Sequence, residues 1–134
     1  RSNTRLLRER LLIEKAAAAH YVPLYAEADT PEEKLPALAE ALTPELPISV
    51  MLLGMGADMH TASIFPGADQ LEQALHGAAR LVAMRAPGAP EPRIALSAKV
   101  ISAARSCAVD RVVGKGGSCQ ETRCDVCGST HQRN

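Results

Sequence analysis

The most constraining feature of the chain is an apolar run that ends at two glycines and is followed at once by an acid and a histidine. The run covers residues 48–53, with Gly54 and Gly56 just after it. A short apolar run of this kind is typical of a strand buried on both faces, and the glycines permit a tight turn. We therefore expect Asp58 and His60 just past the carboxyl end of a parallel strand, where α/β proteins bind their ligands.

The rest of the chain predicts alternating strands and helices. One Phe, two Tyr and no Trp leave the core to Leu, Ile, Val, Ala and Met, which suits a sheet covered by helices rich in Ala and Leu. Thr30-Pro31-Glu32-Glu33 is a capping sequence for a helix that runs to Leu42. Further helices are predicted over residues 4–20, 68–76 and 98–105, and further strands over residues 79–84, 93–97 and 107–113.

This order predicts an α/β fold in three layers, with a mostly parallel sheet flanked by helices and connected by right-handed crossovers. Residues 21–25 contain Pro23 and are expected to form an edge strand or an extended loop. Residues 86–92 contain three prolines and are expected to hold no regular element.

Charge and composition exclude several classes of partner. Lys and Arg number 15, as do Asp and Glu, so no field of one sign favours nucleic acid or a membrane surface. No apolar stretch approaches the roughly 20 residues of a membrane span, and the arginine-rich start is unlike a secretory signal. We therefore predict a cytoplasmic protein. The four cysteines lie at or beyond position 107, which argues against a disulfide framework across the fold.

The glycine turn also carries a family signature. Residues 53–67 read LGMGADMHTASIFPG and closely resemble the hallmark LGxGxDGHTASLFPG of the 6-phosphogluconolactonases. Other stretches agree with that family in the expected order, namely Ser2-Asn3 before an arginine-rich helix, residues 92–97 (PRIALS) and residues 100–105 (VISAAR). The related glucosamine-6-phosphate deaminases continue their Asp-Gly-His differently. The lactonase branch is therefore the closer one, and a sugar-phosphate isomerase or deaminase is the alternative.

The resemblance covers about residues 2–113 and implies a partial Rossmann-like sugar-phosphate isomerase/lactonase fold. It also implies hydrolysis of 6-phospho-D-glucono-1,5-lactone to 6-phosphogluconate in the pentose phosphate pathway. The substrate would be a phosphorylated sugar lactone, with no cofactor and no metal. The resemblance predicts no particular oligomeric state.

The same resemblance implies which residues form the site. His60 would transfer protons and Asp58 would orient the imidazole or the substrate, because imidazole titrates near neutrality. The alternative is that His60 only caps a helix or bonds to a loop carbonyl. The residues expected to bind substrate are Ser2, Asn3, Gly56, Thr61, Arg93 and Lys115. Of these, Arg93 and Lys115 have side chains that pair with phosphate.

The sequence departs from the family pattern in three places. Met59 stands where the family has glycine, and Lys115 follows Gly114 directly instead of completing a G-x-x-K signature. The family's Gly-Gly-Ser/Thr phosphate loop and Asp-Glu-Arg segment are absent from the chain. We therefore expect residues 1–113 to correspond to the carboxyl-terminal part of such an enzyme, through truncation or a shifted reading frame after about Val113, with weak or no activity alone.

Residues 114–134 form a polar segment that is expected to be a disordered tail. It contains possible zinc ligands at close spacing, Cys119, Cys124, Cys127 and His131. A non-catalytic zinc-binding module is therefore a further alternative function. An unstructured tail with incidental thiols is the favoured interpretation, because no helix or hairpin pattern surrounds these residues.

Overall fold

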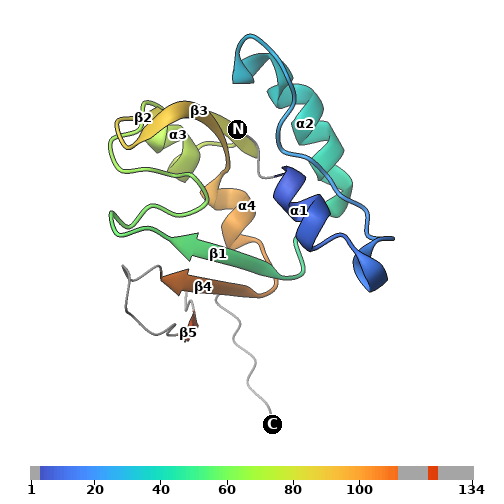
Figure 1. Cartoon of the computed structure of the whole chain (residues 1–134). Helices are drawn as coiled ribbons and strands as arrows, with labels where there is room; N and C mark the ends of the chain where they lie inside the picture. Colours follow the sequence, from blue (N-terminus) through green and yellow to red (C-terminus); the bar gives the residue numbers. More distant parts are fainter. Residues whose placement is uncertain (1–3, 112–120, 124–134) are drawn as a thin grey trace.

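The computed structural model of the chain describes residues 4–111 and 121–123 (Figure 1). Its helices are α1 (Thr4–Arg10), α2 (Leu35–Leu42), α3 (Leu71–His76) and α4 (Ala98–Ser102). Its strands are β1 (Met51–Met55), β2 (Leu81–Ala86), β3 (Ala89–Leu96), β4 (Cys107–Arg111) and β5 (Glu121–Arg123). Short 3-10 helices cover Glu14–Ala16, Pro31–Lys34 and Thr43–Glu45.

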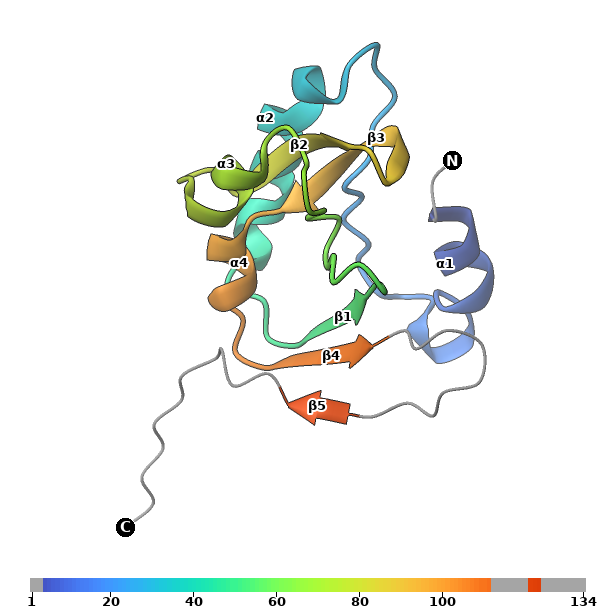
Figure 2. The same ribbon diagram turned by 90° about the vertical axis from the view of Figure 1, so that its left-hand side faces the viewer.

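Within the described ranges the strands form two sheets. In the first, β1 pairs in parallel with β4 from Met51↔Cys107 to Met55↔Arg111, and β5 pairs antiparallel with β4. In the second, β2 and β3 form an antiparallel hairpin. Figure 2 shows the two sheets at opposite ends of the molecule, with α4 and α1 at the two sides between them. The predicted α/β class is confirmed, as is parallel pairing of the strand before the glycine turn.

The expectation of parallel pairing is wrong for β2 and β3. Only Pro87 and Gly88 separate these strands. A parallel connection needs about a dozen residues or more, whereas a connection of two residues joins antiparallel strands. The prediction that residues 86–92 hold no regular element is also wrong, because β3 begins at Ala89.

A bulge explains how prolines fit inside β3. The register shifts between Met84↔Arg93 and Ala86↔Ala89, so the segment that contains Pro90 and Pro92 bulges opposite Arg85. The backbone of Arg85 pairs with Asp69 there: its N–H donates to Asp69 Oδ1 at 2.8 Å, and its carbonyl accepts from the Asp69 N–H at 3.0 Å. Proline lacks an N–H donor and is tolerated at such bulges.

The first helix is shorter than the predicted range of residues 4–20. The N–H groups of Leu11 and Leu12 both donate to the Leu7 carbonyl at 2.9 Å, and Glu14 has a φ of 49°. A left-handed residue breaks the regular helix, so only a 3-10 turn follows α1. Residues 21–25 form an extended loop, which is one of the two predicted alternatives.

The capped helix ends at Leu42 as predicted. The N–H and the hydroxyl of Thr30 both donate to Glu33 Oε1, at 3.2 and 2.9 Å. The first turn is 3-10, and Pro36 falls at the start of α2, where an N–H has no helical partner to lose. The helices predicted over residues 68–76 and 98–105 also form, as the shorter α3 and α4.

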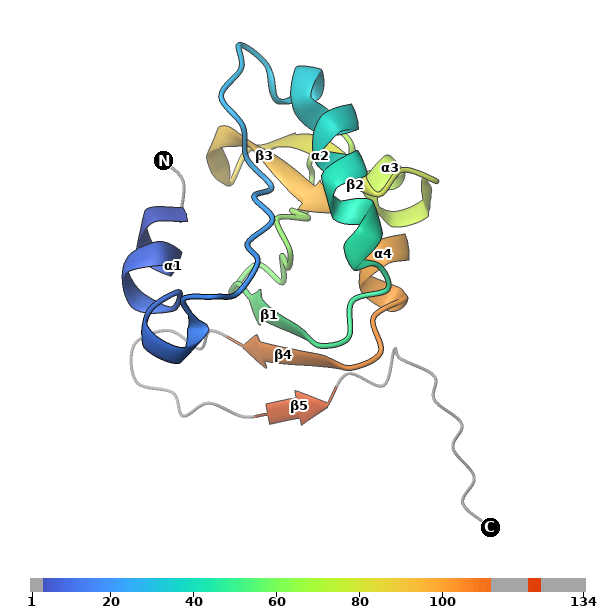
Figure 3. The same cartoon turned by 90° about the vertical axis from the view of Figure 1, so that its right-hand side faces the viewer.

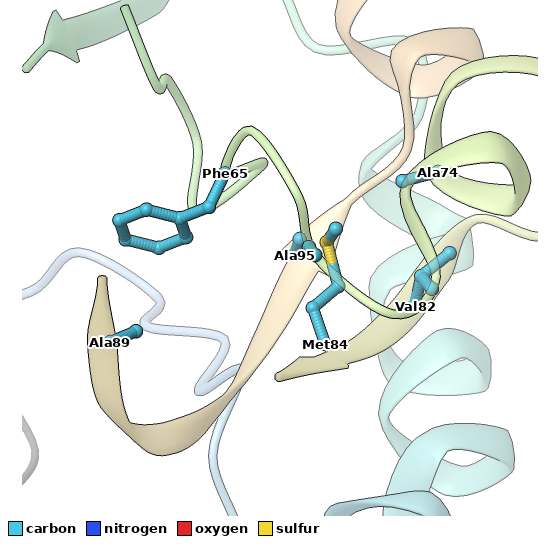
Figure 4. Close-up of a cluster of buried hydrophobic side chains, with 7 residues drawn as sticks. Phe65, Ala74, Val82, Met84, Ala89 and Ala95 are labelled. Atoms are coloured by element: carbon cyan, nitrogen blue, oxygen red, sulfur yellow. The ribbon is translucent and has the colours of Figure 1, made fainter. Parts of the chain in front are cut away.

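Aliphatic side chains and methionine make up most of the core, as the composition predicts, and Phe65 joins them. One buried cluster surrounds the hairpin (Figure 4) and contains Phe65, Ala68, Ala74, Val82, Met84, Ala89 and Ala95. A second cluster joins α2 to β2 through Leu38, Leu42 and Leu81. Figure 3 shows α2 lying across the hairpin. The second cluster holds α2 against the hairpin.

Strand β1 is buried on one face only, so the prediction of burial on both faces is wrong. Met51 is 6% exposed, whereas Val50 and Leu52 are 74% and 78% exposed. Successive side chains of a strand point to opposite faces, and within residues 4–111 and 121–123 no element covers the Leu52 face. An apolar run predicts a strand but does not specify how many of its faces are covered.

An exposed ion-pair network joins three separate segments. Arg85 donates from Nη1 to Glu32 Oε1 at 2.6 Å and from Nη2 to Oε2 at 3.1 Å. Arg85 Nη1 also lies 3.6 Å from Asp69 Oδ2. The hydrogen bonds from Arg85 lower the pKa of Glu32, and the same bonds raise the pKa of Arg85. The network ties the start of the α2 region to β2 and to the segment before α3.

We predict that this network contributes stability that depends on pH. A carboxyl whose folded pKa is lowered stabilises the fold above its unfolded pKa and loses that effect as pH falls through the folded pKa. In thermal melts, Glu32→Gln should therefore reduce the melting temperature at pH 7, and the difference from wild type should shrink below about pH 4.5. Glu40→Gln is the control, because no ion pair described for the chain includes this exposed acid of α2. A difference independent of pH would contradict the prediction.

Candidate active site

The chain turns back on itself directly after β1. The Gly56 N–H donates to the His60 carbonyl and the Met59 N–H donates to the Gly56 carbonyl, both at 2.9 Å. The Thr61 hydroxyl donates to the Gly54 carbonyl at 3.0 Å and fixes the loop to the strand end. Asp58 and His60 therefore lie just past the carboxyl end of β1, as the sequence predicts.

Asp58 and His60 form a hydrogen-bonded pair. His60 Nδ1 lies 2.5 Å from Asp58 Oδ1, and the His60 backbone N–H reaches the same oxygen at 3.4 Å. The side-chain hydrogen bond lowers the pKa of Asp58, so this carboxyl is ionised at neutral pH. A carboxylate can only accept, so Nδ1 carries the hydrogen, and in the neutral imidazole Nε2 then has the lone pair.

The absence of a side chain at Gly56 lets the His60 ring approach the backbone closely. A Cβ built on Gly56 would lie 2.5 Å from His60 Nδ1 and 2.7 Å from Asp58 Oδ1, and real Cβ atoms do not make contacts that short. A side chain at Gly56 would therefore displace the pair.

Phe65 stacks on the imidazole and is a site residue that sequence reasoning missed. The ring centroids of His60 and Phe65 are 4.1 Å apart and the ring planes are inclined by 25°. Phe65 is the one phenylalanine of the chain and belongs to the same signature as His60. Its place in that signature is the sequence feature that could have identified it as a site residue.

The loop contains a group of left-handed residues. Met59, Ala62 and Ser63 have φ values of 67°, 50° and 66°. Such values are costly for residues with a Cβ and are found at sites where the surrounding structure enforces them. Met59 thus adopts the conformation that a glycine would take more easily, and its side chain is 72% exposed.

Arg93 lies apart from the pair, in a cleft of about 570 Å³. The lining comes from α1, the loop over residues 21–29, Ser63 and residues 91–94 of β3. Figure 3 shows this loop running between α1 and the hairpin. In the wall of the cleft, the hydroxyl groups of Thr4 and Tyr21 form a hydrogen bond with their oxygens 3.1 Å apart. Ser63 is the point at which the glycine-turn loop reaches the cleft.

The structure brings some of the predicted site residues together and leaves others outside. Gly56, Asp58, His60 and Thr61 share one loop, and Arg93 lines the adjoining cleft. Ser2, Asn3 and Lys115 lie outside the described residues, as do the possible zinc ligands Cys119, Cys124, Cys127 and His131. Of the predicted tail 114–134, the structure describes only residues 121–123, which form β5. Over residues 4–111 and 121–123, no three His, Cys, Asp or Glu residues gather to hold a metal ion.

Comparison with known proteins shows the family. Residues 1–117 match the sequence model of the family described as glucosamine-6-phosphate isomerases/6-phosphogluconolactonase. The chain belongs to this family. The recognition made from the hallmark sequence is thereby confirmed.

Individual members of the family agree in sequence and in structure. The chain is 47% identical over 98 residues to a 6-phosphogluconolactonase of Rhizobium meliloti (strain 1021), with 70% of this chain and 42% of the relative covered. It is 42% identical over 108 residues to a 6-phosphogluconolactonase of Pseudomonas aeruginosa, with coverages of 78% and 45%. It superposes on the crystal structure of a 6-phosphogluconolactonase from Shewanella baltica OS155 with a TM-score of 0.77 and 39% identity.

That superposition covers 81% of this chain and 47% of the Shewanella protein. The chain thus spans less than half the length of the family members that it matches. In the part of the chain that the structure describes, no helix is long and apolar enough to cross a membrane.

We predict that Gly56→Ala destabilises the protein by about 1–3 kcal/mol, because the added methyl group would overlap the His60 ring. Gly54→Ala is the matched control, since a Cβ at Gly54 meets nothing within 4 Å. Equilibrium urea unfolding of the two variants measures the difference. Equal effects of the two substitutions would show that close packing at Gly56 is not what requires glycine.

We predict that Met59→Gly stabilises the protein by about 0.5–1 kcal/mol. The substitution removes a left-handed penalty of about 1–2 kcal/mol, and the greater freedom of glycine in the unfolded chain returns part of that gain. Ala37→Gly at an exposed position of α2 is the control and should destabilise. Urea unfolding measures both, and a loss of stability in Met59→Gly would contradict the prediction.

Proposed function

We propose that the chain contains the proton-transfer residues of a 6-phosphogluconolactonase, His60 and Asp58. The reaction is hydrolysis of 6-phospho-D-glucono-1,5-lactone to 6-phosphogluconate. The observation that carries the proposal is the Asp58–His60 pair at the end of β1, whose geometry leaves Nε2 of the imidazole available to a ligand. Membership of the family and the names of the matched relatives support the same reaction.

The geometry suits a base that is oriented by a carboxylate. Nε2 of His60 takes a proton from water as the water oxygen bonds to the lactone carbonyl carbon, and the carbonyl electrons move to its oxygen. When the tetrahedral intermediate collapses, the bond to the ring oxygen breaks and the imidazolium returns the proton to that oxygen. Asp58 stays ionised throughout, holds the tautomer and stabilises the imidazolium.

Substrate binding is proposed to use the adjoining cleft. The guanidinium of Arg93 can pair with a phosphate through two parallel hydrogen bonds. Ser2 and Asn3 directly precede Thr4, which lines this cleft, and Gly56 and Thr61 belong to the same turn as His60. We assign Ser2, Asn3, Gly56, Thr61 and Arg93 to substrate contact on these grounds, and Lys115 on its positive charge, which can also pair with phosphate. From the phosphorylated substrate we infer a cytoplasmic location.

The decisive experiment measures acid release from freshly prepared 6-phosphogluconolactone in a pH-stat. His60→Ala should lower kcat by about 10²–10⁴-fold, because positioned proton transfer contributes that much. His76→Ala is the matched control, since His76 lies at the end of α3 and contacts Glu72. Undiminished turnover by His60→Ala would end the proposed role of this residue.

Product binding gives a second readout that needs no turnover. In NMR titrations of the chain, 6-phosphogluconate should shift the signals of His60 and Arg93, whereas gluconate without phosphate should bind more weakly. If 6-phosphogluconate leaves both residues unperturbed, the proposed site is wrong. Ammonia release from glucosamine 6-phosphate would instead support the isomerase or deaminase alternative.

We predict that Arg93→Ala weakens binding of 6-phosphogluconate by about 10–100-fold, because a hydrogen bond to a charged group contributes about 1.5–3 kcal/mol. In the lactonase assay the same substitution should raise KM and leave kcat nearly unchanged, as expected for uniform binding. Arg80→Ala, which removes another exposed arginine of the chain, is the control. A change in kcat without a change in KM would argue for a different role of Arg93.

A further inference from the structure

The imidazole of His60 is held by more than its hydrogen bond to Asp58. That hydrogen bond is partly open to water, because the side chains of His60 and Asp58 are 33% and 51% exposed. An exposed hydrogen bond contributes little net free energy because water competes for both groups, and rotation about the last torsion of a histidine has a broad profile. A further contact is therefore needed to keep Nδ1 facing Asp58.

Phe65 supplies that contact and is itself fixed by the core. Its ring stacks on the imidazole at 4.1 Å, yet only 8% of Phe65 is exposed and it belongs to the buried cluster around the hairpin. In Figure 4 the Phe65 ring projects from its loop toward Ala89 at the start of β3. Phe65 thus has one partner in the core and another in the candidate site.

The turn of the β2–β3 hairpin also lies close to Phe65 and to Asp58. A Cβ built on Gly88 would lie 3.9 Å from Phe65 Cδ1 and 4.0 Å from Asp58 Oδ2, which are ordinary contact distances. The turn between β2 and β3 therefore lies beside the Phe65 ring and beside the oxygen of Asp58 that His60 does not use. The position of the hairpin is linked to the histidine through Phe65.

We propose that Phe65 is a positioning residue, which transmits the fixed position of the β2–β3 hairpin to His60. The stack keeps the imidazole in the orientation that directs Nδ1 to Asp58 and leaves Nε2 for the substrate. The catalytic meaning of this orientation rests on the proposed function, whereas the orientation itself does not. Phe65 touches no reacting atom and acts only through His60.

Nitrogen NMR of the histidine rings in the 134-residue chain tests the orientation directly. In the wild type, His60 should show one set of ring signals in the Nδ1–H tautomer and cross-relaxation with the Phe65 ring protons. Phe65→Met, which conserves bulk without an aromatic ring, should introduce the Nε2–H form and broaden the signals. Phe65→Tyr retains the ring and should restore the wild-type pattern.

Val82→Ala is the matched control for a merely structural effect. Val82 belongs to the same buried cluster but lies away from Phe65 on β2 (Figure 4), so its loss should lower stability without changing the tautomer. A folded Phe65→Met variant with the wild-type tautomer would overturn the proposal. A mixture of tautomers in the wild type would also overturn it, and that measurement needs no variant to fold.

Kinetics separate this proposal from the proposed function. Phe65→Met should lower kcat by more than it raises KM, and Phe65→Tyr should recover kcat. If the chain neither hydrolyses the lactone nor binds 6-phosphogluconate, the function is wrong while the tautomer measurement still decides the role of Phe65. If His60→Ala abolishes turnover but the tautomer is indifferent to Phe65, only the role of Phe65 is wrong.

Discussion

The close approach of the His60 ring to the backbone of Gly56 is the contact on which the site depends. The two hydrogen bonds of the turn bring His60 back over Gly56, and only a residue without a side chain leaves room for the ring there. The same approach places Nδ1 against Asp58. Because Asp58 is ionised at neutral pH, it also selects the Nδ1–H tautomer of the neutral imidazole. The close approach of the His60 ring to Gly56 thus requires a residue without a side chain and also brings Nδ1 to the carboxylate that selects the tautomer.

The hairpin is the rigid part against which this turn is built. Its bulge at Arg85 ties the backbone to Asp69, and the Arg85 side chain extends the tie to Glu32. Its buried face receives Phe65, which carries the packing on to His60. The exposed ion pairs are individually weak, so the buried cluster provides most of the rigidity.

Sequence reasoning predicts features whose cause is local. The Thr30 cap and the turn that presents Asp58 and His60 depend on neighbouring residues, and both form as predicted. The strand around Pro90 was missed because its bulge depends on Asp69, a partner distant in sequence. The exposure of Leu52 could not be predicted either, because an apolar run is the same whether one face or both are covered.

The left-handed residues explain how the short segment 61–65 can contact both the end of β1 and the buried cluster around the hairpin. Between Thr61, which is tied to the strand end, and Phe65, which enters the core, the chain must reverse direction within a few residues. Left-handed conformations at Ala62 and Ser63 make that reversal possible, and the reversal also brings Ser63 to the wall of the Arg93 cleft. The buried Phe65 ring on one side and the Thr61 hydrogen bond on the other oppose relaxation of this strain. The strained segment therefore sets the position of the proposed base relative to the proposed phosphate cleft.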